Sequence, residues 1–433
     1  MTSFPFLTAY DPPGTSEGTL DPLGLYQIAD SLAVQLVPGV RERMQRVRFL
    51  TAVAVGSLVT ENIEDDPTLR DASPYLVWEW LVVEALMRQM SDDPTIHGVP
   101  GTLVAKRALG PNGPGYLDAR SYLKTPRIFG FHGVYKRLAV HLGLIDVHLS
   151  PGPNAERLAD AWARGFGYAG LSAARPQIDR WRTAVTRSLR ERPPRTKPGW
   201  GAEEWDTLAR AFAPRACGAR ERRCLHELLH DTGERALGAF RPLWELQPAF
   251  TDDAFSEEAL HVRLKRSEPH YAPLLDAIRH YERFARGLQD AFDLLKAEAA
   301  GPDAQGFVVS TIAKDRDFLR SIEGLQPQFE RAHAALGEVP RPSLSLQALF
   351  DARFRAFAER LAPVDCAQAL CTHHEAVQKG KSADGKRPWF DRLGPDRIYI
   401  RHRYREERRA ISPDRYVHEY RGKPIRRFRA DLS

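Results

Sequence analysis

The stretch "ASPYLVWEWLVVEALMRQ" (residues 72–89) decides the fold class. Ser73 can cap a helix and Pro74 suits its first turn, so a helix is predicted to begin here. Only Glu79 and Glu84 interrupt its apolar part. A helix that is apolar nearly all round must be covered on every side. We therefore expect it at the centre of an all-helical domain.

Amphipathic patterns extend the helical prediction to most of the chain, because apolar residues recur with a period near 3.6. Strand-like patterns are confined to residues 307–313 and 397–404. The fold class expected is mainly α, with multi-helix domains and a short β element near the C-terminus. The predicted organisation is an extended arm (1–25), a helical domain (26–187), a Pro/Gly-rich linker (188–204), a helical C-terminal domain (205–378) and a basic tail (379–433).

Composition excludes several classes of protein. The longest apolar run, residues 49–59, is far shorter than the roughly 20 residues of a membrane helix, so it is interpreted as a buried core helix. The N-terminus has neither the basic nor the apolar region of a secretory signal. The chain holds four cysteines, a usage that fits a reducing compartment. The cytoplasm is the expected location, with no membrane partner.

Residues 126–165 contain a pattern that resembles the second half of a winged helix-turn-helix. Phe131, Val134, Tyr135, Leu138 and Leu142 share one helix face, and Gly143 can end that helix. A short apolar run, a Ser-Pro-Gly-Pro turn and a returning helix follow. The resemblance covers about residues 102–165 and implies that His132–Leu142 is a recognition helix and 147–153 the wing. It also implies three residues that would face DNA: Lys136, Arg137 and His141.

The C-terminal tail is strongly basic. From Lys379 to Ser433 there are 17 Lys/Arg and 8 Asp/Glu, a net charge of +9 against +6 for the whole chain. Arg and Lys are interleaved there with Trp and Tyr, and cations together with planar side chains suit a nucleic-acid surface. Strand alternation predicts one cationic face. The residues expected to contact nucleic acid in the tail are Arg397, Arg401, Arg403, Arg405, Arg426 and Arg427. The alternative is an Arg-rich edge that docks on a protein.

The motif His226-Glu227-Leu228-Leu229-His230 has the spacing with which metalloproteases hold zinc on a helix. Ala236 stands where a third histidine would be needed, and the flanking residues are charged. We expect a solvated helix face and no catalytic or metal-binding residue in the chain. The alternative is a zinc hydrolase with His226 and His230 as ligands and Glu227 as general base, in which Glu245 could supply the third ligand.

The cysteines offer a second metal hypothesis. Cys366 and Cys371 are followed by His373 and His374, and thiolates with imidazoles can hold structural zinc. The spacing matches no zinc ribbon or finger, and cysteine is commonly buried without a ligand. We expect no cofactor, with zinc as the alternative.

These observations together predict a non-catalytic subunit that binds nucleic acid, with DNA expected, in a multi-protein bacterial system. The context expected for such a subunit is antiviral defence. The contrasting hypotheses are a protein scaffold without nucleic-acid contact and the zinc hydrolase. The expected partners are therefore nucleic acid and other protein subunits.

Overall fold

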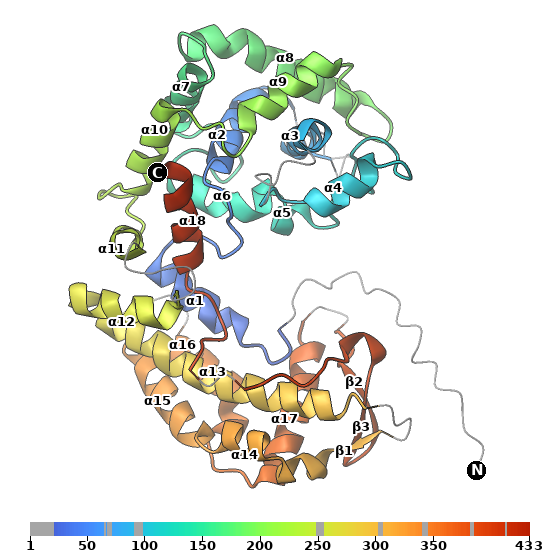
Figure 1. Cartoon of the computed structure of the whole chain (residues 1–433), viewed down its shortest axis with the longest axis vertical. Coiled ribbons are helices and arrows are strands. Elements are labelled where there is room, and N and C mark those ends of the chain that lie inside the picture. The colour runs from blue at the N-terminus through green and yellow to red at the C-terminus, as the bar shows by residue number, and fades with distance from the viewer. Residues whose placement is uncertain are drawn as a thin grey trace. The chain divides into compact units, whose positions relative to one another are not determined.

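The structure is a computed structural model that describes residues 21–64, 66, 72–90, 98–247, 255–301, 306–339, 345–381, 385–411 and 414–433. Within these residues the chain is mainly α-helical, as predicted. It divides into two compact units (Figure 1): unit 1 holds residues 1–33 and 250–420, and unit 2 holds residues 34–249 and 421–433. Helix α1 (Tyr26–Leu36) crosses the first boundary. None of the described helices is long and apolar enough to span a membrane.

Two apolar helices form the centre of unit 2. Helix α2 (Phe49–Thr60) is buried from Phe49 to Val59, which confirms its predicted place in the core. Helix α3 (Pro74–Met90) begins at the predicted proline, and the Ser73 hydroxyl accepts a hydrogen bond from the Leu76 N–H at 3.3 Å. The two acidic residues that interrupt α3 are both buried.

Aromatic side chains from four helices fill the space beside α2. They are Trp78 of α3, Trp162 of α7 (Ala155–Gly165), Trp181 of α8 (Leu171–Arg190) and Phe212 of α9 (Ala202–Phe212). The rings of Trp162 and Phe212 stack with centroids 5.8 Å apart, and Trp78 meets Phe212 edge-on at 5.6 Å. Such pairs stabilise a core beyond their area burial.

A buried ion pair joins the start of α2 to α10 (Ala219–Leu229). Arg48 Nε lies 3.1 Å from Glu221 Oε1, and the Thr51 hydroxyl donates to the same carboxylate at 2.8 Å. The Arg48 guanidinium also donates to the Ala213 carbonyl. These contacts offset the cost of burying both charges.

Unit 2 also contains α4 (Thr102–Leu109), α5 (Pro126–Phe129), α6 (Phe131–His141), α11 (Phe240–Leu246) and α18 (Gly422–Leu432).

The long helix α13 (Ala272–Glu298) is the core of unit 1, and α14 and α15 pack against it. A small antiparallel sheet in the order β1-β3-β2 completes the unit. The other elements of unit 1 are α12 (Glu257–Ser267), α14 (Arg316–Ile322), α15 (Leu325–Gly337), α16 (Leu346–Phe354), α17 (Pro363–Lys379), β1 (Phe307–Val308), β2 (Phe390–Gly394), β3 (Arg397–Ile400) and the 3₁₀ helices η4 (Pro269–Tyr271), η5 (Val309–Lys314), η6 (Arg355–Phe357) and η7 (His402–Tyr404).

Both strands predicted from the sequence are shorter than expected. After Val308 the chain turns into η5, where the Asp396 carboxylate accepts a hydrogen bond from the Ser310 N–H at 2.9 Å. After Ile400 it turns into η7. Both segments continue as short 3₁₀ helices, so alternation alone overestimated the strand lengths.

The predicted linker 188–204 lies inside unit 2 rather than between domains. Thr196 is buried, its hydroxyl donates to the Glu84 carboxylate, and it accepts a hydrogen bond from the Leu117 N–H at 2.8 Å. The high proline and glycine content of residues 188–204 therefore indicates an irregular segment packed within unit 2, not a linker between domains. Glu84 is one of the two buried acids on α3. Hydrogen bonds to its carboxylate offset the cost of burying it.

The predicted tail does not form a region of its own. Strands β2 and β3 belong to unit 1 and α18 belongs to unit 2. Residues 1–20 of the predicted arm lie outside the described residues. Its last residues are packed in unit 1, where Leu23 and Leu25 are buried.

Candidate nucleic-acid interface

The predicted recognition helix corresponds to α6. The five residues predicted to share its inner face are all buried, and Gly143, with φ of 68°, follows the C-cap. This is a left-handed conformation that favours glycine. The following turn is closed by an antiparallel bridge between Ile145 and Pro151, after which α7 begins at Ala155. The local order is therefore helix, bridged turn, helix.

Two of the three residues predicted to face DNA from α6 make contacts within unit 2. The Lys136 ammonium donates to the Val147 carbonyl at 2.6 Å, and His141 Nε2 lies 3.0 Å from the Arg235 carbonyl oxygen. Arg137 is exposed. The Lys136 ammonium has two further N–H donors besides the one given to Val147, whereas His141 Nε2 faces the carbonyl oxygens of Arg235 and Ala236.

In the tail, the predicted cationic face is interrupted at Arg401. Ile398 and Ile400 are buried while Arg397 and Tyr399 are half-exposed, as alternation predicts. Arg401 was expected on the same face as Arg397. It is instead 4% exposed, with its Nε 3.7 Å from an Asp391 carboxylate oxygen, because the strand ends at Ile400.

The aromatic residues of the tail are engaged with one another and with cations. Trp389 and Tyr404 stack with ring centroids 4.8 Å apart and an interplanar angle of 5°. Arg403 lies over the Tyr404 ring and Arg405 over the Tyr399 ring, at 5.1 and 5.0 Å. These rings stabilise unit 1 through cation–π and stacking contacts.

The two remaining tail residues, Arg426 and Arg427, are half-buried on α18 in unit 2. The predicted nucleic-acid-binding residues are thus distributed over both units. Four of them lie in unit 1 (Arg397, Arg401, Arg403, Arg405) and five in unit 2 (Lys136, Arg137, His141, Arg426, Arg427).

The zinc-like motif lies at the end of α10. The imidazole rings of His226 and His230 stack with centroids 3.9 Å apart, and His230 Nδ1 lies 2.9 Å from the His226 carbonyl oxygen. Glu227 is paired with Arg157 at 2.5 Å, and Glu245 with Arg241. In the described ranges, no group of three or more His, Cys, Asp or Glu could hold a metal ion.

The second metal hypothesis concerns α17. All four cysteines are free thiols, and burial raises the pKa of Cys366 and Cys371 to about 12. His373 Nε2 lies 2.8 Å from the Leu23 carbonyl oxygen, while His374 Nε2 accepts a hydrogen bond from the Trp389 N–H at 2.9 Å. These imidazoles hold backbone segments in unit 1.

One charged region escaped the sequence reasoning. Residues 94–145 contain seven Lys/Arg and a single acid, Asp118, which is buried. We call these seven cations the acid-poor surface: Lys106, Arg107, Arg120, Lys124, Arg127, Lys136 and Arg137. All except the half-buried Lys136 are exposed, and the helices of this stretch follow one border of unit 2 in Figure 1. A search for stretches without carboxylates would have found it.

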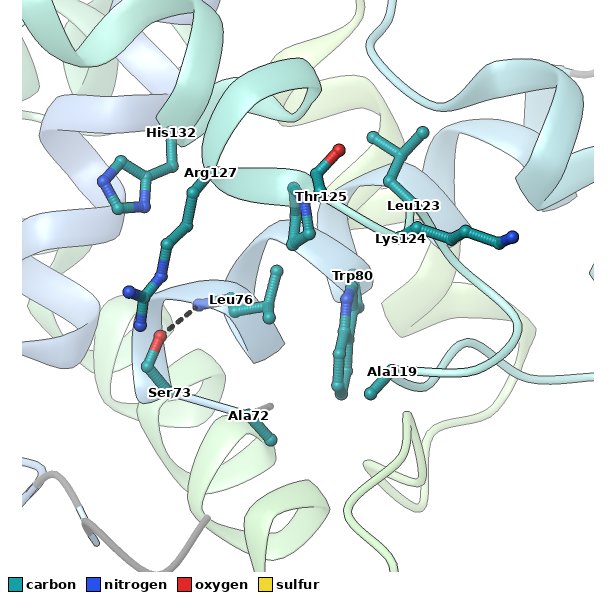
Figure 2. Close-up of a pocket in the computed structure, with 11 residues that line it drawn as sticks. Ala72, Ser73, Leu76, Trp80, Ala119, Leu123, Lys124, Thr125, Arg127 and His132 are labelled. Atoms are coloured by element: carbon teal, nitrogen blue, oxygen red, sulfur yellow. Dashed lines mark hydrogen bonds between the residues drawn. The ribbon is translucent and has the colours of Figure 1, made fainter. Parts of the chain in front are cut away.

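A pocket opens within the acid-poor surface, between the start of α3 and residues 119–132 (Figure 2). Its volume is about 610 Å³. Leu76 and Leu123, both half-exposed, contribute apolar wall, while Lys124 and Arg127 contribute positive charge. The lining also includes Trp80, whose side chain is fully buried. The pocket therefore combines an apolar surface with cations.

Buried acid and neutral imidazole lie beside this pocket. Glu79 accepts hydrogen bonds from the Tyr122 hydroxyl at 3.0 Å and the His132 N–H at 3.2 Å, and burial raises its pKa to about 7. Burial, with Lys136 and Arg127 nearby, lowers the pKa of His132 to about 4. The imidazole is thus neutral at pH 7, and the positive charge there comes from lysine and arginine.

No protein-family model matches the chain, and neither a curated protein nor a solved structure is significantly similar to it.

Proposed function

We propose that this protein binds nucleic acid, with DNA as the expected form, through the acid-poor surface of unit 2. The observation that carries the proposal is the imbalance of seven cations against one buried acid over residues 94–145. Clustered Lys and Arg neutralise backbone phosphates and supply sequence-independent affinity. The acids that would repel phosphates are missing from this stretch.

The contacts of α6 favour phosphate binding over the reading of bases. Lys136 and His141 are held by backbone carbonyls, whereas Lys124 and Arg127 are exposed at the mouth of the pocket. Phosphate contacts position a protein on a duplex, and base contacts specify the sequence. Binding is therefore expected to depend weakly on sequence.

A role as a non-catalytic subunit of a larger complex is the second part of the proposal. Leu103 on α4 is 82% exposed, and Val147 in the turn after α6 is 62% exposed. A contiguous exposed apolar patch marks a site of contact with another protein, so this part of the proposal requires both side chains to belong to one patch. A scaffold without nucleic-acid contact is the alternative.

Fluorescence anisotropy with a labelled DNA duplex tests the proposal. The full-length protein should bind, and Lys124→Ala with Arg127→Ala should weaken binding by about tenfold or more, because each removes a charge-assisted contact. Arg180→Ala with Arg190→Ala is the matched control, since both residues are exposed on α8 outside the acid-poor stretch. Loss of affinity that is equal in the two double variants would contradict the assignment.

A further inference from the structure

The pocket of the acid-poor surface has the dimensions of a ligand site. Its volume of about 610 Å³ lies within the range of ~300–1,000 Å³ that is common for small-molecule sites. Its apolar side chains come from α3 and from residues 119–126, so the wall is built by a packed helix and the segment opposite it. Planar or apolar groups can bury against such a wall.

The polar groups of the described lining residues are suited to an anion. They comprise Lys124, Arg127, two hydroxyls and the His132 imidazole, with no carboxylate among them. The Ser73 oxygen already accepts from the Leu76 N–H, and its own proton remains available to a ligand. Because arginine and hydroxyl donors match phosphate oxygens, this inventory favours phosphate.

Trp80 provides an independent observation at the same place. Its side chain is fully buried, and its indole N–H is among the buried polar atoms of the described residues that lack a hydrogen-bond partner. A buried donor without a partner costs free energy unless something accepts from it. In Figure 2 the indole nitrogen lies at the end of the ring toward Thr125, whose hydroxyl also lines the pocket.

The two cations flank the apolar part. Figure 2 shows Arg127 on the Ser73 side of Leu76 and Trp80, with Lys124 on the other side. A ligand with one charge would meet only one of them. A ligand with two phosphates joined by a group that also carries a planar ring would meet both cations and the apolar wall.

We propose that this pocket binds one nucleotide of a nucleic-acid strand, its base against the half-exposed Leu76 and Leu123 and its two flanking phosphates at Arg127 and Lys124. The inference rests on the proposed function, because the nucleotide reaches the pocket from a strand bound at the acid-poor surface. Extruding a nucleotide from a duplex costs a few kcal/mol, so ends and unpaired positions are favoured. A free nucleotide carries the same chemistry and is distinguished by the experiment.

Isothermal titration calorimetry of the full-length protein tests this with four probes: thymidine 3′,5′-bisphosphate, thymidine 5′-monophosphate, thymidine and inorganic phosphate. The bisphosphate resembles a nucleotide within a strand and should bind about tenfold more tightly than the monophosphate, because it adds one charge-assisted contact. Equal affinity for the two nucleotides would assign the pocket to free nucleotides and would overturn the proposal that the bound nucleotide belongs to a strand. Equal affinity for bisphosphate and inorganic phosphate would overturn the base-binding wall.

A pocket-blocking variant tests the location. Ala119 is exposed and lines the pocket, so Ala119→Trp should fill it without changing charge and should weaken bisphosphate binding by about tenfold or more. Ala173→Trp, at an exposed position of α8, is the matched control and should bind normally. Unchanged binding in Ala119→Trp would overturn the pocket as the site.

The two proposals fail separately. If the protein binds duplex DNA but not the bisphosphate, the acid-poor surface keeps its role and the nucleotide pocket is overturned. If the bisphosphate binds and no polynucleotide does, the pocket is a site for a free ligand, which overturns both the strand source and the proposed function.

Discussion

The buried carboxylate of Glu79 accepts a hydrogen bond from the backbone N–H of His132 at 3.2 Å, so a side chain of α3 caps the first turn of α6. Gly130 precedes that turn, and a Cβ there would lie 1.9 Å from Glu79 Oε1. The carboxylate also faces the positive end of the helix dipole. One acid in the core of unit 2 thus holds the start of α6, the helix that carries Lys136 and Arg137 of the acid-poor surface.

Glu79→Gln should change the pH dependence of stability. The pKa of Glu79 in the folded protein is about 7, above its ordinary value of 4.5, so folding favours the protonated acid. That contribution is complete below pH 4.5 and is lost as the pH rises through 7. Urea unfolding from pH 4.5 to 8 should show the wild type losing up to ~3 kcal/mol relative to the variant. A difference independent of pH would contradict the shifted pKa.

Gly56→Ala should destabilise unit 2 through Trp78. A Cβ at Gly56 would lie 2.3 Å from Trp78 Nε1, and the indole is held by the Ala52 carbonyl at 3.1 Å. Because the ring is buried among other aromatic side chains, it cannot move freely, and overpacking of this kind costs about 1–3 kcal/mol. Trp78→Ala should cost about 3–5 kcal/mol by leaving a cavity. Thermal unfolding measures both, and a neutral Gly56→Ala would refute the close approach.

The buried pair of Arg48 and Glu221 should show strong coupling. Arg48→Met leaves the Glu221 carboxylate buried without its guanidinium and should cost about 3–5 kcal/mol. Adding Glu221→Gln removes the unpaired charge, so the double variant should recover part of the loss. A double-mutant cycle by chemical denaturation measures the coupling, and additive losses would show that the pair does not act as a unit.

The buried residues of helix α18 should contribute more to stability than Arg427 does. Phe428 and Ile425 are fully buried, and Asp431 accepts a hydrogen bond from the Arg46 side chain at 2.7 Å. Phe428→Ala should therefore cost about 3–5 kcal/mol of stability. Arg427→Ala, at a half-buried position of the same helix, should cost less than about 1 kcal/mol. Equal losses of stability in the Phe428→Ala and Arg427→Ala variants, measured by thermal unfolding, would contradict this prediction.

The sequence predicted the helices whose apolar residues require burial. Apolar residues predicted three buried helices, and all three are present. They are residues 74–89, the run 49–59 and α6 with its apolar inner face. The partners of Glu79 could not be predicted, because Tyr122 and His132 come from distant segments and meet it only through packing. The pocket likewise exists only between packed elements. The tail was misjudged because its charge suggested an independent region, while its aromatic and aliphatic residues are built into both units.

The salt dependence of DNA binding tests the acid-poor surface most directly. Each phosphate contact contributes about −0.9 to the slope of log K against log salt concentration. Replacing Lys124 and Arg127 with alanine should therefore reduce the magnitude of the slope by about 1.8. Replacing Arg403 and Arg427 of the tail should leave it unchanged. An unchanged slope in the Lys124/Arg127 variant, with a reduced slope in the tail variant, would contradict the account and place phosphate binding in the tail.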